Sequence, residues 1–197
     1  MSYIIRALVT LLQFAFSLYL FLLMLRFLFQ LVRADFYNPL SQAIVKLTNP
    51  PLKLLRRFIP GYAGVDWPCV VLLILVQGLE ILLLSLLYTG HPPNIAALLV
   101  LSLADLLQLC AYLYIFFILI IVVISWVNPG AYNSITVLLY QVTDPLLRRA
   151  RRLLPDLGGL DFSPMLVMLV IYLFLSLVVA PLRDWGNQLI GLPMRIL

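Results

Sequence analysis

The sequence predicts an all-α membrane protein with four transmembrane helices in two repeats of the same topology. Of the 197 residues, 64% are hydrophobic and only 11% are charged, and the mean hydropathy is +1.09. In a soluble globular domain about 25% of the residues are charged. Four stretches are long and apolar enough to cross a hydrocarbon core of about 30 Å as helices. The polar segment between the first two stretches recurs, 95 positions later, between the last two.

The duplication is clearest between residues 48–66, TNPPLKLLRRFIPGYAGVD, and residues 143–161, TDPLLRRARRLLPDLGGLD, which agree at 8 of 19 positions without a gap. Each copy consists of a span, a polar segment and a second span, so the predicted halves are residues 1–92 and 93–197. Because each half returns to the side on which it began, the two are parallel repeats. We expect a pseudo-two-fold axis along the membrane normal, unlike the inverted repeats of many transporters.

The four predicted spans are residues 7–32, 67–88, 97–126 and 164–182. The first has no convincing small-residue cleavage pattern, which predicts an uncleaved anchor helix. The third hydrophobic stretch begins as early as Asn94, and a straight helix of that length must tilt, kink or protrude from the bilayer. The fourth has Pro164 in its first turn and Pro181 near its predicted exit.

We predict a short basic helix in each of the segments that join the spans, residues 38–60 and 133–155. In the second segment Asp144 precedes Pro145, an order typical of a helix N-cap and first helical position, and Pro155 would end a helix of about ten residues. Asn49 before Pro50 holds the same place in the first segment. Asn49 and Asp144 are therefore expected to cap these helices.

The basic residues of these segments form two clusters. The first basic cluster is Lys53, Arg56 and Arg57, and the second basic cluster is Arg148, Arg149, Arg151 and Arg152. At 100° per residue, basic side chains fall on one arc of each helix and apolar side chains on the other. A basic amphipathic helix beside a span is typical of the membrane interface. By the positive-inside rule both clusters face the cytoplasm, and both termini face outward.

The two clusters have two interpretations. They either enforce topology while contacting lipid phosphate, or form a docking surface for an anionic lipid headgroup or an acidic protein. Anionic headgroups supply about 1 kcal/mol for each basic residue near the surface. A nucleic acid is less favoured, because no aromatic stacking platform accompanies the charge. The expected partners are therefore membrane lipids together with a protein partner or a second copy of the chain.

Glycines follow each predicted basic helix. Gly64 in the first copy and Gly158 and Gly159 in the second allow the positive φ with which the backbone can turn back into the membrane. The double glycine lacks the GxxxxGK[ST] pattern and follows no strand, so it indicates a turn and not a phosphate-binding loop.

Four further polar residues recur at equivalent positions and are expected to have structural roles. Asp66 and Asp161 either cap the following helix or pair with an arginine of the preceding cluster. Asn38 and Asn133 are expected to be caps or turn formers near the start of each polar segment.

Four of the polar side chains within the hydrophobic spans are candidate functional residues: Arg26, Gln77, Glu80 and Asp105. A charge in a span costs about 2.5–3.5 kcal/mol on insertion scales, so each charged residue is considered first as functional. Arg26 either extends to the headgroups or forms an ion pair inside the bundle, with Glu80 as its candidate partner. Glu80 is either a protonatable relay or a neutral acid bound to a neighbour such as Gln77. Asp105 is buried if the third span begins near Asn94, and interfacial if it begins near Ala104.

No motif of the sequence supports catalysis. It has no HExxH, no paired metal ligands and no nucleophile beside a base. Cys69 and Cys110 stand alone in apolar runs, and His91 is the single histidine. We therefore expect no enzymatic activity, no cofactor, no metal site and no disulfide.

The doubled pattern, and especially its TDPLL, RR-x-x-P and GGLDFSP elements, resembles the YggT family of small integral membrane proteins. The resemblance implies a two-repeat protein of the bacterial inner membrane, associated with osmotic tolerance, cell division and assembly of membrane complexes. It implies no catalytic residue. The first copy has TNPP in place of TDPL and a single Gly64, so the second copy follows the family pattern more closely.

The leading hypothesis is a noncatalytic inner-membrane protein that organises anionic lipid or docks a partner membrane complex through two cytoplasmic basic helices. The alternative is an ion or proton channel or transporter subunit that uses Glu80, Arg26 and Asp105.

Overall fold

The computed structural model describes residues 3–35, 37–62, 64–128, 130, 133–153 and 161–190. Within these residues the chain forms α1 (Tyr3–Leu31), α2 (Pro39–Leu55), α3 (Trp67–Thr89), α4 (Ile95–Val127), α5 (Ser134–Leu153), α6 (Ser163–Phe174), the π-helix η1 (Leu175–Val179) and α7 (Ala180–Ile190). Helices α6, η1 and α7 are continuous and form the fourth span. Helices α1, α3 and α4 and the fourth span are each long and apolar enough to cross a membrane, which confirms the four predicted spans.

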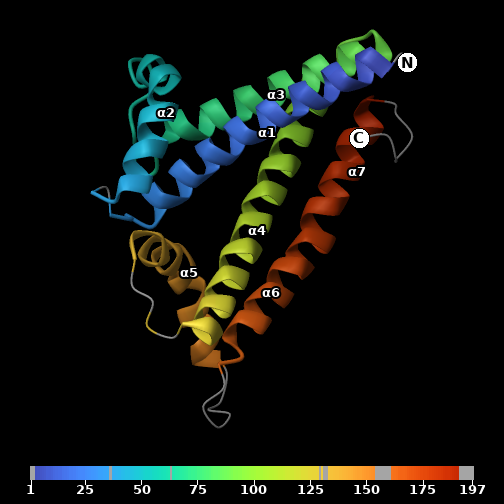
Figure 1. The fold of residues 1–197 in the computed structure, drawn as a ribbon. Coiled ribbons are helices and arrows are strands. Elements are labelled where there is room, and N and C mark those ends of the chain that lie inside the picture. The colour runs from blue at the N-terminus through green and yellow to red at the C-terminus, as the bar shows by residue number, and fades with distance from the viewer. Residues whose placement is uncertain are drawn as a thin grey trace.

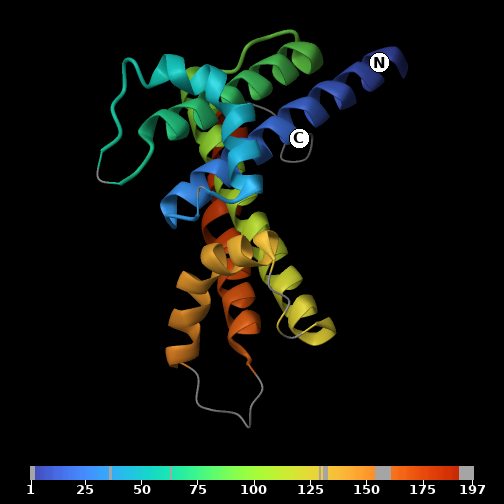
Figure 2. The same cartoon turned by 60° about the vertical axis from the view of Figure 1, so that its left-hand side comes forward.

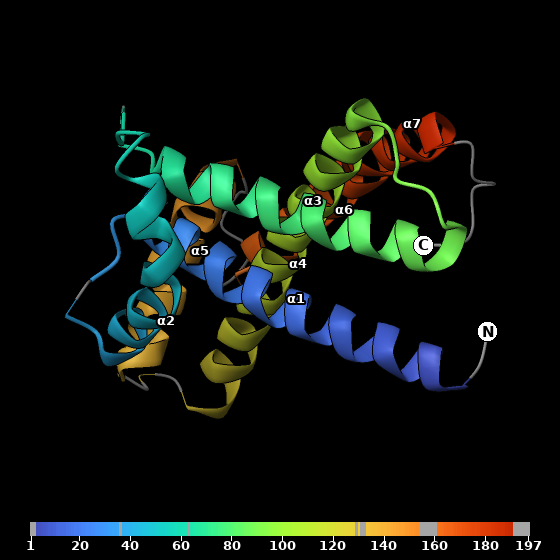
Figure 3. The ribbon, with the colours of Figure 1, turned by 90° about the horizontal axis from the view of Figure 1, so that it is seen from above.

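The four long helices form two pairs. Helices α1 and α3 run side by side, and α4 and the fourth span run side by side at an angle to them (Figures 1 and 3). The start of α1, the α3–α4 turn and the end of α7 lie at one end of the bundle, and α2 and α5 lie at the other, which we call the basic end (Figure 1). Both repeats therefore have the same direction, as the duplication predicts.

The two repeats contact each other at both ends of the bundle. At the basic end α2 packs against α5 (Figure 2), and the Asn38 side-chain amide donates to the Ser134 carbonyl at 2.5 Å. At the other end Asn94 Nδ2 donates to the Leu189 carbonyl at 3.1 Å. Between the ends, α4 packs against both α3 and α7.

Helices α2 and α5 begin earlier than expected, at the two asparagines. The Asn38 side chain accepts a hydrogen bond from the Leu40 N–H at 3.0 Å. Asn133 Oδ1 accepts from the N–H groups of Ile135 and Thr136, both at 2.9 Å. Both asparagines are therefore helix caps, as one of the two expected roles proposed.

The prediction that Asn49 and Asp144 cap short helices is wrong, because both lie inside the longer helices α2 and α5. An Asn or Asp before a proline has the composition of a helix start, but here the helix continues through the proline. An interior proline removes a hydrogen bond and costs about 3 kcal/mol or more. Burial of Leu52 and Leu147 on the following turns offsets much of this cost. Pro155 lies outside the described residues.

The apolar faces of α2 and α5 are covered in part by the spans of the protein itself. Ile44 and Leu52 of α2 and Leu138 of α5 join Leu23 and Leu28 of α1 in one hydrophobic core. The basic helices are therefore fixed to the bundle, while the side chains of Lys53, Arg57, Arg149 and Arg152 are exposed.

The fourth span extends beyond Pro181, where its end was predicted, and continues to Ile190. The turn before the proline is the π-helix η1, in which the Ala180 N–H bonds to the Leu175 carbonyl five residues earlier. A π-turn is wider than an α-turn and so gives the proline ring room within a continuous helix.

Two glycines mark close helix contacts. A Cβ atom added to Gly78 of α3 would lie 2.7 Å from Leu98 Cδ2 of α4. A Cβ atom added to Gly186 of α7 would lie 2.7 Å from both Cγ and Cδ2 of Leu101 of α4. Small residues of this kind allow membrane helices to approach closely.

A candidate anion-binding site

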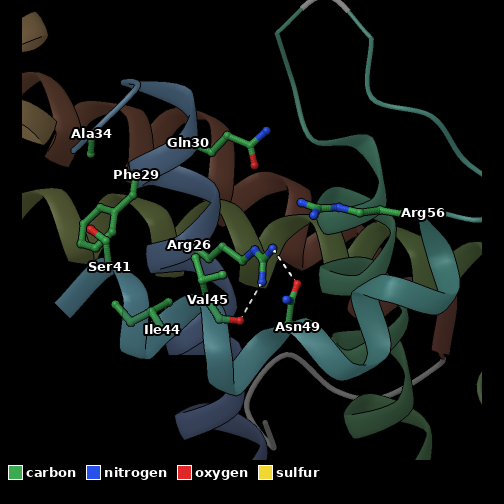
Figure 4. Close-up of a pocket in the computed structure, with 9 residues that line it drawn as sticks. All are labelled: Arg26, Phe29, Gln30, Ala34, Ser41, Ile44, Val45, Asn49 and Arg56. Atoms are coloured by element: carbon green, nitrogen blue, oxygen red, sulfur yellow. Dashed lines mark hydrogen bonds between the residues drawn. The ribbon is translucent and has the colours of Figure 1, made fainter. Parts of the chain in front are cut away.

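Arg26 of α1 is buried at the basic end and bound to α2. Its side chain is 6% exposed. It donates a hydrogen bond to Thr48 Oγ1 at 2.7 Å. It also donates to the Val45 carbonyl at 3.2 Å and to Asn49 Oδ1 at 3.3 Å (Figure 4). Neither predicted role describes this geometry, because the guanidinium does not extend to the surface and is not paired with Glu80.

All three acceptors of Arg26 are neutral. Among the residues that the structure describes, no carboxylate lies within ion-pair distance of its guanidinium. A guanidinium stays protonated in proteins and has five N–H donors. The three hydrogen bonds to α2 leave some of these donors without a partner. A buried charge without a counter-ion is unfavourable. This site therefore favours an anion.

The guanidinium borders a pocket of about 300 Å³ between α1 and α2. The pocket is lined by Arg26, Phe29, Gln30, Ala34, Ser41, Ile44, Val45, Asn49 and Arg56. Arg26, Gln30 and Arg56 extend toward a common space (Figure 4). Two guanidinium groups and an amide thus border one cavity.

Ser41 lines the same pocket and is 3% exposed. Its hydroxyl has no hydrogen-bond partner in the described part of the chain. An unsatisfied buried hydroxyl is rare in folded proteins and costs about 1–3 kcal/mol. Because this oxygen is also closed to solvent, a ligand oxygen in the pocket would reach it only after the Ser41 side chain turned to another rotamer.

The first basic cluster lies at the end of α2, with all three side chains exposed. Arg56 Nη2 donates to the carboxylate of Asp66 at 2.5 Å, and the Asp66 side chain is 4% exposed. Asp66 occupies the N-cap position of α3 but makes no side-chain cap hydrogen bond. Of its two expected roles, the ion pair is the one that the structure shows.

The second basic cluster lies on the last two turns of α5 and is also exposed. Arg151 pairs with Asp161 at 2.9 Å, and Arg148 pairs with Asp144 one turn earlier. Asp161 also accepts from the Ser163 N–H at 2.9 Å, although the N-cap position of α6 is Phe162, so the ion pair is the expected role that the structure shows. Partial burial by itself would raise the pKa of Asp161, but hydrogen bonds from Ser163 and the charge of Arg151 hold that pKa below its ordinary value.

Gly64 has a φ of +78°, which confirms its predicted role in the turn between α2 and α3. Gly158 and Gly159 lie outside the described residues.

A second polar pocket, of about 240 Å³, lies between α1, α3 and α4 within the spans. It is lined by Gln13, Gln77, Glu80, Ile81, Leu84, Tyr88 and Asp105. Glu80 is buried and accepts from Gln77 Nε2 at 3.2 Å, as one interpretation of Glu80 predicts. The structure thus brings Glu80 and Asp105 to one pocket and places Arg26 in another.

Asp105 pairs with Arg183 of α7. Because α4 begins at Ile95, Asp105 lies inside the helix, which favours the earlier of the two predicted starts. The sequence did not identify Arg183 as this partner, because Arg183 follows the predicted end of the fourth span at residue 182. Its position follows from the extension of the fourth span through Pro181, for which the sequence gives no simple signal.

Sequence reasoning also missed Ser41, Thr48 and Gln30 as neighbours of Arg26. Thr48 is part of the duplicated pattern, and a buried threonine on a basic helix could have indicated a contact with a span. Ser41 and Gln30 carry no such signal, because their roles depend on how α2 packs on α1.

Comparison with known proteins agrees with the two-repeat fold. The chain matches the CCB3/YggT family twice, over residues 5–87 and 100–182. An uncharacterised protein of Pseudomonas aeruginosa is 44% identical over 191 residues, which cover 96% of this chain and 95% of that protein. The YggT protein of Escherichia coli K12, also described as uncharacterised, is 37% identical over 181 residues, 91% of this chain and 93% of its own length. No solved structure matches.

Proposed function

The chain belongs to the CCB3/YggT family, and on that premise we propose that it is a noncatalytic protein that binds and organises anionic lipid through its two basic clusters. The observation that carries the proposal is the charge at the basic end. The two clusters hold seven cations, and the acids paired with them are Asp66, Asp144 and Asp161, which leaves a net charge of 7 − 3 = +4.

Four of the seven cations are free to bind lipid. Lys53, Arg57, Arg149 and Arg152 are exposed and form no ion pair within the described residues. Each would gain about 1 kcal/mol beside an anionic membrane surface. We place both clusters at the cytoplasmic face of a bacterial inner membrane, following the positive-inside rule.

Exposed apolar side chains beside the cations favour lipid over an acidic protein. Leu54, Phe58 and Leu153 are 67%, 80% and 78% exposed and lie next to the basic residues. Apolar side chains that alternate with cations are typical of segments that enter the boundary between headgroups and acyl chains.

Quenching of tryptophan fluorescence by brominated lipids tests the proposal. Trp67 begins α3 and Trp126 is near the end of α4, both at the basic end, whereas Trp185 is on α7. A Trp185→Phe protein would be reconstituted in phosphatidylcholine vesicles that contain either brominated phosphatidylglycerol or brominated phosphatidylcholine. We expect stronger quenching by the phosphatidylglycerol, with a preference that falls as salt is added.

Two matched variants test whether the preference for phosphatidylglycerol arises from the second basic cluster. Replacing all four arginines of that cluster with glutamine should reduce the preference, and replacing them with lysine should preserve it. Equal quenching by the two lipids in the protein with unmutated clusters would refute recognition of anionic lipid. If only crosslinking to a membrane protein responds to the glutamine variant, the clusters dock a protein instead.

The polar pocket in the spans supports a second candidate, a proton or ion path. Glu80, Asp105 and Gln13 come from three different helices and line one cavity. Intramembrane acids of this kind are typical of proton relays. Arg26, which was expected to share this path, lines a different pocket and has no part in the candidate.

Proton flux into proteoliposomes tests the second candidate. A relay predicts flux above that of empty vesicles and its loss in Glu80→Gln. Gln13→Leu, which removes another polar group from the same pocket, should slow it. Flux equal to that of empty vesicles would end this candidate for the isolated protein.

A further inference from the structure

We propose that the pocket between α1 and α2 is a specific binding site for one phosphate group, with Arg26 as its principal ligand. The inference rests on the proposed function, because it names a lipid phosphate as one source of that group. It goes further by assigning a single pocket, which shares only Arg56 with the two basic clusters.

Charge is the first argument. Arg26 is buried, its acceptors are neutral, and the pocket also includes Arg56, which among the described residues pairs with one acid, Asp66. The pocket therefore has two cations for one carboxylate. A phosphate oxygen would compensate the charge of Arg26 and accept charge-assisted hydrogen bonds from the N–H groups that α2 does not use.

The donors are the second argument. The Ser41 hydroxyl is buried without a partner, and the Gln30 amide borders the same cavity. Phosphate offers several acceptor oxygens in different directions, whereas a chloride ion would leave most of these donors unsatisfied. A cavity of about 300 Å³ has room for a phosphate with its ester substituents.

The second repeat gives an internal comparison. A shift of 95 residues places Ile121 at the position of Arg26, and Ile121 belongs to the hydrophobic core. The same shift places Asp144 at the position of Asn49 and Thr136 at that of Ser41. The Thr136 hydroxyl donates to the Asn133 carbonyl at 2.9 Å, so it is satisfied. We therefore expect one site in each chain, in the first repeat.

The depth of the pocket suits a lipid headgroup. Arg26 is five residues from the end of α1 at Leu31, which is about 7.5 Å along the helix axis. The polar headgroup layer on each side of a bilayer is about 5–7 Å thick. With Leu31 placed at the outer edge of that layer, Arg26 would lie near the boundary where a lipid phosphate approaches the hydrocarbon core. A free phosphate anion would present the same oxygens.

Calorimetric titration of the full chain in a neutral detergent tests the site. The probes are dihexanoyl-phosphatidylglycerol and, separately, inorganic phosphate. Both are titrated in about 1 M NaCl, where the Debye length is about 3 Å, so that the attraction of the exposed clusters for anions is screened. We expect one phosphatidylglycerol for each chain. Competition by inorganic phosphate would identify the phosphate ion as a sufficient ligand, and its absence would identify the lipid as the source.

Two pocket variants and one surface control complete the experiment. Arg26→Leu should weaken binding by about tenfold or more, as expected for a charge-assisted hydrogen bond. Ser41→Ala should weaken it by about two- to tenfold, and it removes no hydrogen bond of the described fold. Arg6→Gln removes an exposed cation at the other end of α1, outside the pocket and both basic clusters, and should leave binding unchanged.

The proposal is overturned if neither probe binds saturably, or if Ser41→Ala and a folded Arg26→Leu both bind as the unmutated protein does. If Arg26→Leu does not fold, Ser41→Ala decides alone. Failure here is distinguishable from failure of the proposed function, because both pocket variants keep all seven cluster cations and can retain lipid selectivity in the quenching experiment.

Discussion

Arg56 binds Asp66 across the turn that leads from α2 back into the membrane, and the same ion pair recurs 95 residues later between Arg151 and Asp161. In both repeats the pair joins the end of a basic helix to the residues that precede the next span. The two copies differ in burial: Asp66 is 4% exposed, whereas Asp161 is 46% exposed. The duplication thus preserved a contact in two different environments.

This difference predicts unequal costs for the same substitution. Asp66→Asn should lower the free energy of unfolding by about 1.5–3 kcal/mol, because it weakens a charge-assisted bond at a buried site. Asp161→Asn should lower it by less than about 1 kcal/mol, since an exposed pair is screened by solvent. Reversible unfolding in mixed micelles measures both values. Equal losses, or a larger loss for Asp161→Asn, would contradict the structural difference.

The lowered pKa of Asp161 predicts that the folded chain loses a small part of its stability in acid. Its pKa is lower in the folded chain than the ordinary value of 3.8, so folding favours the carboxylate. Its stabilisation should be fully present above about pH 4 and disappear as the pH falls through the lower, folded pKa. The difference in melting temperature between the unmutated protein and Asp161→Asn should therefore narrow toward zero below that pKa. A difference that persists at that acidity would exclude this carboxylate as its cause.

The Asp105–Arg183 pair predicts energetic coupling between α4 and α7. Asp105→Asn and Arg183→Gln should each lower stability by about 1–3 kcal/mol, because each weakens a partly buried ion pair. The double variant should lose less than the sum of the two, since the second substitution removes a group already without its partner. A double-mutant cycle of unfolding free energies measures this coupling. Strict additivity would show that the pair does not stabilise the bundle.

Close packing of α7 on α4 predicts that Gly186 tolerates no side chain. Gly186→Ala would place its Cβ 2.7 Å from two Leu101 atoms and should cost about 1–3 kcal/mol. Gly78→Ala is a matched control, because its Cβ would meet mainly the mobile Cδ2 end of Leu98 at 2.7 Å. The melting temperature should fall further for Gly186→Ala. An equal or smaller fall would contradict the tighter contact at α7.

The spans were predictable because apolar length is a local property of sequence. Their predicted and observed starts differ by a few residues, as with residue 7 against Tyr3 for α1. The basic helices were predictable in type but not in extent. Their prolines have the local pattern of helix starts, whereas the capping hydrogen bonds form at Asn38 and Asn133.

The candidate site was only partly predictable, because its partners are distant in sequence. The sequence identifies Arg26 as a candidate functional residue only because a charge within a span is unusual. Its contacts with Thr48 and Asn49 depend on the packing of α2 against α1, over a separation of more than twenty residues. The contact between Asp105 and Arg183 spans 78 residues and depends on a helix that continues through a proline.

The most direct test of anionic-lipid recognition is the lipid composition around the protein when it is extracted from cell membranes in polymer nanodiscs. We expect phosphatidylglycerol and cardiolipin to be enriched around the unmutated chain relative to the bulk membrane. This enrichment should disappear when all seven cations of the two basic clusters are replaced by glutamine. A lipid composition equal to the bulk membrane around the unmutated chain would contradict anionic-lipid recognition.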